Sequence, residues 1–274
     1  MTVSNLTALA AGIQRSLNQQ NTRVATAISQ IVSGNRLVSA STDVAALATA
    51  TSLQTQTSGL RNASLNISQA SSLLQVADGG ADQIGNALDR LNALAVQANN
   101  GTLSDADRGA LNQEFQALTQ EIDRISGSTR FNSTNLLDGS LASGLNFQIG
   151  GDAGDQVSLT IGGLSSSNLF GGTTPDISTA AGAQAALASV QAARNSVTTT
   201  RADIGAFQQG LDFAAATIET AIQNQEAARA ELADADIAAL STESAQARVQ
   251  QQASISLLAQ TNRLSGNLLT LLNE

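Results

Sequence analysis

The two ends of the chain carry apolar residues in a pattern that repeats every eleven residues. Near the N-terminus the steps are 3, 4, 4, 3, 4, 4 and 3, through Leu6, Leu9, Ile13, Leu17, Gln20, Val24, Ile28 and Ile31. Near the C-terminus they are 4, 4, 3, 4, 4 and 3, through Val249, Ala253, Leu257, Gln260, Leu264, Leu268 and Leu271. An eleven-residue repeat gives about 3.67 residues per turn, so each stripe runs nearly straight or winds slightly to the right. The pattern predicts two long helices, each with one apolar face.

Each terminal stripe is interrupted once by a glutamine, at Gln20 and at Gln260. Because such a helix has no core of its own, the matched faces suggest that the termini meet, within one chain or between neighbouring copies. The two glutamines are either tolerated polar residues or partners that meet in an assembly and set its register.

Two segments between the ends follow a strict seven-residue repeat instead. In residues 53–98 the a and d positions are Leu60, Ala63, Ile67, Ala70, Leu74, Ala77, Ala81, Ile84, Leu88, Leu91, Ala95 and Ala98. In residues 185–235 they include Val190, Ala193, Val197, Thr200, Ile204, Phe207, Leu211, Ala214 and Ile218. Such long heptad runs predict helices packed side by side with left-handed coiling. Gly79, Gly80 and Gly85 lie off the first seam, where they allow close approach or bending, or are tolerated at the surface.

Residues between the heptad segments predict a short helix and a β-hairpin. Ser104 and Asp107 have capping-box spacing at the start of a helix over 104–126. Residues 143–162 alternate apolar and polar positions around a Gly-rich turn, which favours a hairpin over a phosphate or calcium loop. Residues 162–184 are rich in Gly, Ser and Thr and are expected to form a flexible surface loop before the second long helix.

Composition removes most catalytic chemistry. The 274 residues include no Cys, His, Trp or Tyr, and all 13 basic residues are Arg. This excludes Ser-His-Asp and Cys-His centres, catalytic lysines, and His or Cys metal sites. The 22 acidic residues could pair for acid–base chemistry, but solvated helix faces and caps are the interpretation we favour. We therefore expect neither an enzyme nor a cofactor.

Charge and hydropathy exclude two further classes of partner. The net charge is −9 and basic residues do not cluster, which argues against nucleic-acid binding. The sequence contains no run of about 18 apolar residues, so it predicts no membrane span. The N-terminus also lacks the basic and apolar regions of a cleavable signal peptide.

Several short motifs, in this order and spacing, resemble those of bacterial flagellin. The N-terminal half contains Ser33-Gly34-Asn35-Arg36-Leu37, Asp43-Val44-Ala45-Ala46, Leu94-Ala95-Val96-Gln97-Ala98 and Glu121-Ile122-Asp123-Arg124-Ile125-Ser126. The middle adds Arg130-Phe131-Asn132, Leu136-Leu137-Asp138-Gly139 and Phe147-Gln148-Ile149-Gly150. Near the end come Asp234-Ala235-Asp236, Gln251-Gln252-Ala253, Leu258-Ala259-Gln260 and Asn267-Leu268-Leu269-Thr270-Leu271-Leu272. Ser265-Gly266 and Leu240 depart from the family, which often has Pro and Glu there.

The resemblance implies a short flagellin without large outer variable domains. The expected fold is mainly α: an out-and-back bundle of long helices forming a coiled-coil shaft, a small β-hairpin, and N- and C-terminal helices that form an inner coiled-coil assembly domain. Residues 1–42 would supply one half of that inner domain with a connecting spoke, 43–239 the shaft, and 240–274 the other half.

The resemblance also implies a structural subunit that polymerises into the extracellular flagellar filament for swimming motility. Export would use the flagellar type III apparatus, without a cleavable signal peptide. The expected partners are other copies of the chain, the flagellar cap and hook-associated junction proteins, and an export chaperone on the C-terminal helix. The residues expected to pack in the inner tube are Leu6, Leu9, Ile13, Leu17, Val24, Ile28, Ile31, Val249, Leu257, Leu264, Leu268 and Leu271.

A second class of function is recognition by a host innate receptor. The resemblance places this contact at Arg90, Leu94 and Glu114, although neighbouring residues depart from the pattern of recognised flagellins. We favour another interpretation, in which the Arg and Glu are exposed residues beside a Leu of the heptad seam, at a contact between subunits.

Two rival identities share parts of the pattern. A hook–filament junction protein has the same plan but is not expected to grow long filaments alone. A cytoplasmic helical hairpin of chemoreceptor type is also Ala-rich and heptad-based, but the predicted β-hairpin and the eleven-residue terminal stripes argue against it.

Overall fold

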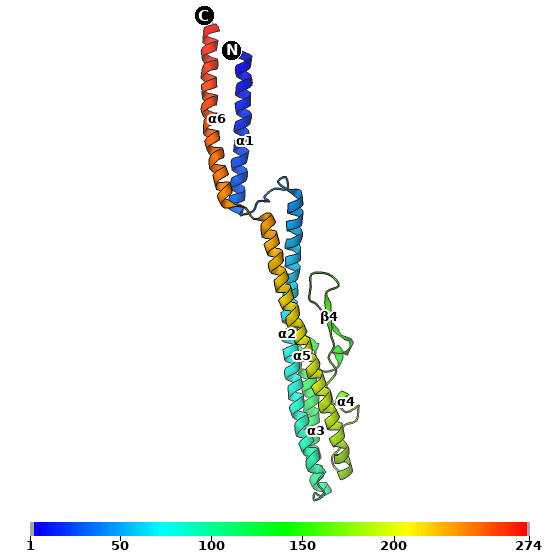
Figure 1. Cartoon of the computed structure of the whole chain (residues 1–274). Coiled ribbons are helices and arrows are strands. Elements are labelled where there is room, and N and C mark those ends of the chain that lie inside the picture. The colour runs from blue at the N-terminus through cyan, green and yellow to red at the C-terminus, as the bar shows by residue number, and fades with distance from the viewer. Residues whose placement is uncertain (1–2, 273–274) are drawn as a thin grey trace. The chain divides into compact units, whose positions relative to one another are not determined.

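The computed structural model describes residues 3–272 and divides the chain into two compact units. Unit 1 comprises Met1–Thr55 and Asn224–Glu274, and unit 2 comprises Gln56–Gln223. Unit 1 contains α1 (Val3–Ser33) and α6 (Ile237–Leu272) (Figure 1). The boundaries between the units fall within α2 (Val44–Ala98) and α5 (Ala180–Ala233). The mainly helical fold expected from the sequence is confirmed.

Unit 2 is organised around the heptad seams of its long helices. From Ala63 to Ala98, every a and d position of α2 is buried. On α5 the buried a positions are Val190, Val197, Ile204, Leu211 and Ile218. These positions join one apolar cluster, so the seven-residue repeat identified the shared core correctly.

The long helices differ from expectation at their ends. α2 begins at Val44 rather than at residue 53, because the Asp43 carboxylate accepts the Ala46 backbone N–H at 2.9 Å and caps the helix. α5 spans Ala180–Ala233 rather than 185–235. Both shifts lie outside the regular heptads, where periodicity carries little information.

The third helix, α3 (Asp105–Ser128), begins with the predicted capping box. The Ser104 hydroxyl accepts the Asp107 N–H at 3.3 Å, and the Asp107 carboxylate accepts the Ser104 N–H at 3.2 Å. The buried Arg108 donates to the carbonyls of Ala98 and Asn100 at 2.8 and 3.0 Å, which ties α3 to the end of α2. The periodicity of apolar residues in the sequence did not indicate that Arg108 is buried.

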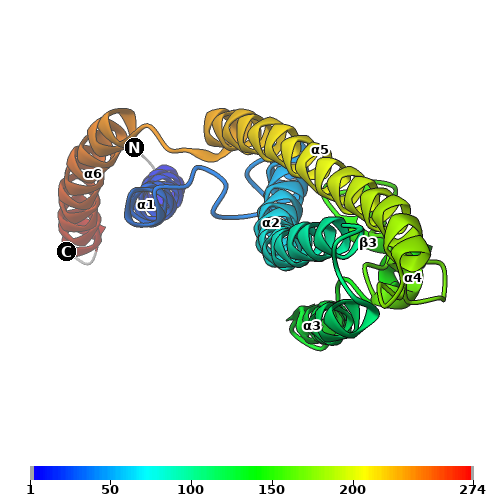
Figure 2. The same cartoon turned by 90° about the horizontal axis from the view of Figure 1, so that it is seen from below.

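Two small antiparallel pairs of strands complete unit 2. β3 (Leu145–Gln148) and β4 (Gln156–Leu159) form the predicted hairpin, with Phe147 opposite Val157. β1 (Arg130–Phe131) pairs with β2 (Thr134–Asn135), and a 3-10 turn, η1 (Ser140–Ser143), follows. In Figure 2 the β3 hairpin lies beside α5.

The segment 162–184 differs from the flexible surface loop that was expected. It contains one turn of helix, α4 (Ser166–Leu169), and its Leu164, Leu169 and Ile177 are buried in the core. The Asp123 carboxylate of α3 accepts both the N–H and the hydroxyl of Ser166 at 2.8 Å. These three apolar residues are separated by many small polar residues, so they do not form a periodic pattern that the sequence analysis could detect.

The three glycines off the α2 seam have different surroundings. A Cβ at Gly80 would lie 2.6 Å from the Thr129 hydroxyl oxygen and 2.8 Å from Leu137, so glycine is required there for close packing. A Cβ at Gly85 would only touch Val197 at 4.0 Å, and one at Gly79 would meet nothing within 4 Å. Only Gly80 is therefore explained by packing within the chain.

Candidate assembly surface on the terminal helices

The terminal helices α1 and α6 pack against each other as an antiparallel pair, with the two chain ends at the same end of the pair (Figures 1 and 2). The side-chain amide of Gln251 donates to the Asn21 side-chain oxygen at 2.7 Å, which fixes the register. The predicted meeting of the termini therefore occurs within a single chain.

The seam between them follows a seven-residue pattern on both helices. The buried or half-buried positions that make this pattern on α1 are Ala10, Ile13, Leu17, Gln20, Val24, Ala27 and Ile31. On α6 they are Leu240, Ser244, Ala247, Gln251, Ser254, Leu258, Thr261 and Ser265. The alternating steps of three and four are those of a left-handed pair. The α6 side is mostly small or polar, so the large residues of α1 provide most of the apolar surface.

The seam covers only part of the predicted inner-tube set. Of the residues on α1, it includes Ile13, Leu17, Val24 and Ile31, while Leu9 and Ile28 are exposed. On α6, Val249, Leu257 and Leu264 lie outside the seam. The side chains of Leu6, Leu268 and Leu271 lie outside the described residues.

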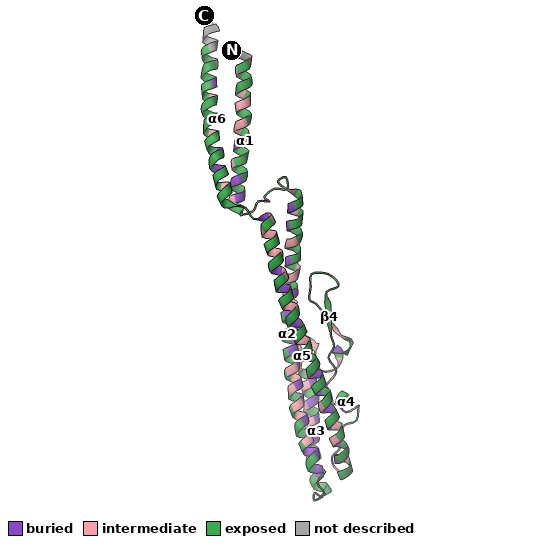
Figure 3. Cartoon of the chain, in the orientation of Figure 1, coloured by how far each residue is buried: buried purple, intermediate pink, exposed green. Residues whose placement is uncertain are grey.

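The predicted C-terminal stripe forms a second apolar face on α6. Val249, Leu257 and Leu264 are 65, 53 and 53% exposed. At 100° per residue, this stripe lies roughly 130° around the helix from the seam. Figure 3 shows that both terminal helices are exposed over much of their length. α6 thus carries one face covered by α1 and one apolar face without cover in the described chain.

The two stripe glutamines occupy different environments. Gln20 is only 9% exposed, and its side-chain oxygen has no hydrogen-bond partner among the described residues. Gln260 is exposed. In the register fixed by Asn21 and Gln251, Gln260 lies roughly 12 Å further along the pair than Gln20, so the two amides do not meet within one chain.

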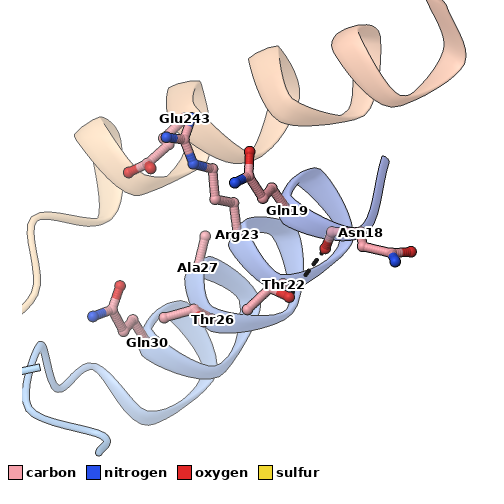
Figure 4. A pocket seen from close by; sticks show the side chains of 8 residues that line it. All are labelled: Asn18, Gln19, Thr22, Arg23, Thr26, Ala27, Gln30 and Glu243. Atoms are coloured by element: carbon pink, nitrogen blue, oxygen red, sulfur yellow. Dashed lines mark hydrogen bonds between the residues drawn. The ribbon is translucent and has the colours of Figure 1, made fainter. Parts of the chain in front are cut away.

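A polar pocket of about 560 Å³ opens where the seam residues of α6 are small (Figure 4). Arg23 extends from α1 towards Glu243 of α6, and the remaining lining residues come from α1: Asn18, Gln19, Thr22, Thr26, Ala27 and Gln30. Because Ser244 and Ala247 face this part of α1, the two helices leave space that larger side chains would fill.

The base of the pair is held by a crossing of the two connecting segments. Asn35 and Asp234 form an isolated antiparallel bridge, flanked by hydrogen bonds from Arg36 N–H to the Ala233 carbonyl at 2.7 Å and from Ala235 N–H to the Gly34 carbonyl at 3.0 Å. Gly34 has φ +66°, a conformation that suits glycine. The crossing brings together the motifs at 33–37 and 234–236, a role that their separate positions in the sequence did not reveal.

The residues of the predicted receptor contact lie close together in unit 2. The Arg90 guanidinium donates to the Glu114 carboxylate at 2.6 and 2.9 Å, so the two charges are paired with each other. Leu94 is 1% exposed and belongs to the core. Only Arg90 and Glu114 of this set are therefore at the surface.

The described residues hold no group of three or more His, Cys, Asp or Glu side chains that could bind a metal ion. Over the same residues, no helix is both long and apolar enough to cross a membrane. The main features of the terminal helices are therefore the α1–α6 seam and the uncovered apolar stripe on α6, both of which are packing surfaces.

Two family models match the chain. The bacterial flagellin N-terminal helical region matches residues 4–142, and the bacterial flagellin C-terminal helical region matches residues 187–272. Among similar proteins, a flagellin of Halalkalibacterium halodurans is 33% identical, and the match covers 90% of each chain. A 30.7 kDa flagellar filament core protein of Treponema maltophilum is 32% identical, with 94% of this chain and 95% of that protein covered.

Solved structures show the same architecture. A crystal structure of Bacillus cereus flagellin is 29% identical, has a TM-score of 0.51, and covers 56% of this chain and 88% of its own. A candidate flagellar hook-associated protein from Vibrio parahaemolyticus has a TM-score of 0.59 at 14% identity, with 70% of this chain and 100% of that chain covered. The second likeness concerns the fold alone.

Proposed function

The chain belongs to the bacterial flagellin family and is a structural subunit of the flagellar filament, and we propose that α1 and α6 form the inner assembly layer of that filament. In this proposal residues 1–32 and 240–274 line the inner tube and the remaining helices surround it. The family consists of structural proteins, and no catalytic role is proposed.

The observation that carries the proposal is the uncovered stripe of Val249, Leu257 and Leu264 on α6. Full burial of one such side chain is worth about 1.5–3 kcal/mol. A subunit that polymerises can gain this free energy only between copies, because α1 already occupies the other face of α6. Assembly would then order the terminal pair further, which couples its folding to polymerisation.

Serine substitutions in the stripe test this role. Leu257→Ser and Leu264→Ser, made one at a time, should leave helicity by circular dichroism unchanged because both side chains are exposed. Each should raise the critical concentration for polymerisation about tenfold or more, since about 1.4 kcal/mol corresponds to a factor of ten.

Ile255→Ser is the matched control. Ile255 is also half exposed on α6 but lies off the stripe, and its substitution should leave the critical concentration nearly unchanged. Equal critical concentrations for the Leu257, Leu264 and Ile255 variants would show that the stripe does not pack in the filament.

The remaining partners are proposed on the same basis. A filament subunit that functions outside the cell must be exported, and we assign that export to the flagellar type III apparatus with a chaperone on the exposed stripe of α6. Cap and hook-associated junction proteins would contact the assembled chain. Binding of a host innate receptor at Arg90 and Glu114 would have to compete with the ion pair between them.

The alternative role, that of a hook–filament junction protein, has weaker support. Relatives near 30% identity over almost the whole chain are filament proteins, whereas the hook-associated structure is only 14% identical. Incubation of the purified chain with filament seeds, followed by negative-stain microscopy, separates the two roles. Long filaments support the subunit, and an end-bound chain that does not elongate supports the junction protein.

A further inference from the structure

The exposed turn that joins α2 to α3 contains Asn100 followed by Gly101 (Figure 1). Asn100 is the only asparagine in the sequence that precedes a glycine. The side-chain carbonyl carbon of an asparagine can be attacked by the backbone nitrogen of the next residue, which closes a five-membered succinimide ring. Glycine at that next position favours ring closure, because it has no Cβ to obstruct the ring and its backbone is conformationally permissive.

The backbone nitrogen of Gly101 is available as the nucleophile. Its N–H donates no hydrogen bond within the described part of the chain, and a Cβ at Gly101 would meet nothing within 4 Å. The Asn100 carbonyl of the same peptide unit accepts hydrogen bonds from the Arg108 guanidinium at 3.0 Å and from the Leu103 N–H at 3.2 Å. A charged donor on this oxygen stabilises the deprotonated amide, because resonance shares the negative charge between nitrogen and oxygen.

The side-chain carbonyl of Asn100 is polarised for attack. Its oxygen accepts the Thr102 backbone N–H at 3.1 Å and the Thr102 hydroxyl at 3.0 Å. Attack on the Cγ atom moves negative charge onto this oxygen, and donors already aimed at such an oxyanion lower the barrier. The folded turn therefore supplies hydrogen-bond donors to both reacting groups, which an unstructured peptide of the same sequence does not.

The positive charge beside the turn is fixed in position. Arg108 is only 6% exposed, and it also donates to the Ala98 carbonyl and pairs with the largely exposed Asp105. The turn directly precedes the N-terminus of α3, where unpaired backbone N–H groups favour negative charge. Both features favour the negative charge that develops during the reaction and remains in its product.

We propose that Asn100 is a site of spontaneous deamidation in the folded chain. The Gly101 nitrogen loses its proton and forms a bond to Asn100 Cγ, the C–N bond of the side-chain amide breaks, and ammonia leaves with that proton. Water then opens the succinimide at either of its two carbonyl carbons. One route gives aspartate, and the other gives isoaspartate, in which the main chain runs through the former side chain. The reaction requires water alone.

The isoaspartate product suits the surroundings of the turn. In this product the Asn100 carbonyl group that accepts from Arg108 becomes a free carboxylate, so the hydrogen bond from the guanidinium becomes an ion pair. Each modified chain gains one negative charge and one additional main-chain atom between α2 and α3. Because only water is consumed, the modified fraction increases with the age of the chain, whether or not the chain is assembled.

Mass spectrometry of the aged protein tests the proposal. Trypsin releases residues 91–108 as one peptide, which contains Asn92 and Asn99 as internal references. During incubation of the folded chain near neutral pH, the mass change from amide to carboxylic acid should accumulate at Asn100. Asn92 and Asn99 should stay unmodified, because each is followed by a bulkier residue than glycine. Methylation by an isoaspartyl methyltransferase identifies the isoaspartate fraction.

The synthetic peptide 91–108 separates the effect of the fold from that of the sequence. The folded chain should deamidate at Asn100 about threefold or more faster than the peptide, because only the fold holds the donors in place. A folded chain that reacts at the same rate as the peptide, or more slowly, would overturn the proposal. So would equal modification of Asn99 and Asn100.

Two substitutions of the exposed Thr102 test the hydroxyl donor. Thr102→Val removes the hydroxyl and keeps the shape of the side chain, whereas Thr102→Ser keeps the hydroxyl and is the control. Both variants should retain wild-type helicity and thermal midpoint. Deamidation of the folded chain should slow about threefold in Thr102→Val and stay near the wild-type rate in Thr102→Ser. Equal rates in the two variants would contradict activation of Asn100 by the turn.

Discussion

At the residue scale, the buried side chain of Gln20 affects the stability of the α1–α6 pair. Its side-chain oxygen is buried in the α1–α6 seam without a hydrogen-bond partner among the described residues. Leaving such a group unpaired costs about 1–3 kcal/mol, which is a large share of what a two-helix pair gains from packing. Gln20 therefore keeps the terminal pair weak in the single chain.

Gln20→Leu should stabilise the pair. Removing the unpaired acceptor and adding apolar surface should slow hydrogen exchange of the α1 backbone amides by about tenfold, which corresponds to about 1.4 kcal/mol. Exchange measured by mass spectrometry reports this directly. Gln14→Leu, at an exposed position on the same helix, is the control and should have little effect. Unchanged exchange in the Gln20 variant would mean that the amide finds a partner in solution.

Asp138 shows how a charge can organise a turn. The carboxylate accepts the Ser140 backbone N–H at 2.9 Å and the Asn135 side-chain amide at 2.9 Å. The Ser140 backbone hydrogen bond, followed by side-chain hydrogen bonds from Ser140 and Asn135, lowers the pKa of Asp138 below its usual value. Gly139, with φ +95°, provides the turn between these partners.

Asp138→Asn should therefore change how stability depends on pH. Because the folded pKa lies below the unfolded one, the carboxylate stabilises the fold above about pH 4 and loses this effect as the pH falls through the folded pKa. The variant should be about 1 kcal/mol less stable than wild type at pH 7. The difference should disappear in acid, as measured by urea unfolding between pH 7 and about pH 3.

Asp152→Asn provides the comparison for that experiment. The Asp152 carboxylate lies in the exposed β3–β4 turn and accepts no hydrogen bond from the described residues. Its substitution should change stability little at either pH. A pH-independent loss in Asp138→Asn would show that the turn depends on shape and not on charge.

At the level of elements, α2 and α5 are joined by an apolar seam and by two arginines of α5, Arg194 and Arg201. Arg201 donates to Asp78 and to Asp82 at 2.8 Å, so one guanidinium bridges two carboxylates one turn apart on α2. The hydrogen bond to Asp78 is the main cause that raises the pKa of Arg201 above its usual value. The Arg201 side chain is 40% exposed, so solvent screening limits what the bridge contributes.

Arg201→Met should cost about 1 kcal/mol in low salt, because it removes the bridge and leaves two like charges facing each other along α2. The loss should shrink in about 1 M salt, where the Debye length is about 3 Å. Urea midpoints at the two salt concentrations measure this. Arg194→Met removes a single pair with Asp89 and should cost less. A loss that does not depend on salt would point to packing of the arginine stem.

The heptads and the terminal stripes show where periodicity is a reliable guide to packing. On α2 the apolar positions of the seven-residue repeat and the buried seam coincide from Ala63 to Ala98, because both follow the repeat of one core. On α6 they separate: Leu257 and Leu264 lie outside the seam, whereas Ser244 and Thr261 lie within it. A small or polar seam residue carries no hydropathy signal, so the sequence pattern alone could not identify this face.

At the level of the whole molecule, the division into two units separates stability from assembly. Unit 2 contains the large apolar core, while the apolar cluster at the base of unit 1 consists of Leu37, Ala46, Ala50 and Ala233. A domain with its own core can fold without its neighbours. Unit 1 depends instead on the pairing of two helices, which is marginal in water.

Deletion of residues 1–32 or 240–274 should therefore leave unit 2 folded and abolish polymerisation. Circular dichroism melts should show the transition of unit 2 near its wild-type midpoint, and negative-stain microscopy with seeds should show no elongation. Deletion of either segment should have the same effect, because each removes one member of the α1–α6 pair. Filaments formed by either shortened chain would contradict the inner-layer role.

The sequence by itself determined the helices, their two periods, the hairpin, the capping box and the absence of His, Cys and Lys chemistry. These follow from local rules, because side-chain periodicity reflects the turn of a helix or the pleat of a strand. Only the tertiary structure decided which face of α6 meets α1, that the segments at 33–37 and 234–236 cross, and that Gln20 is buried unpaired. Those outcomes depend on the register and shape of segments far apart in the chain, which no local pattern encodes.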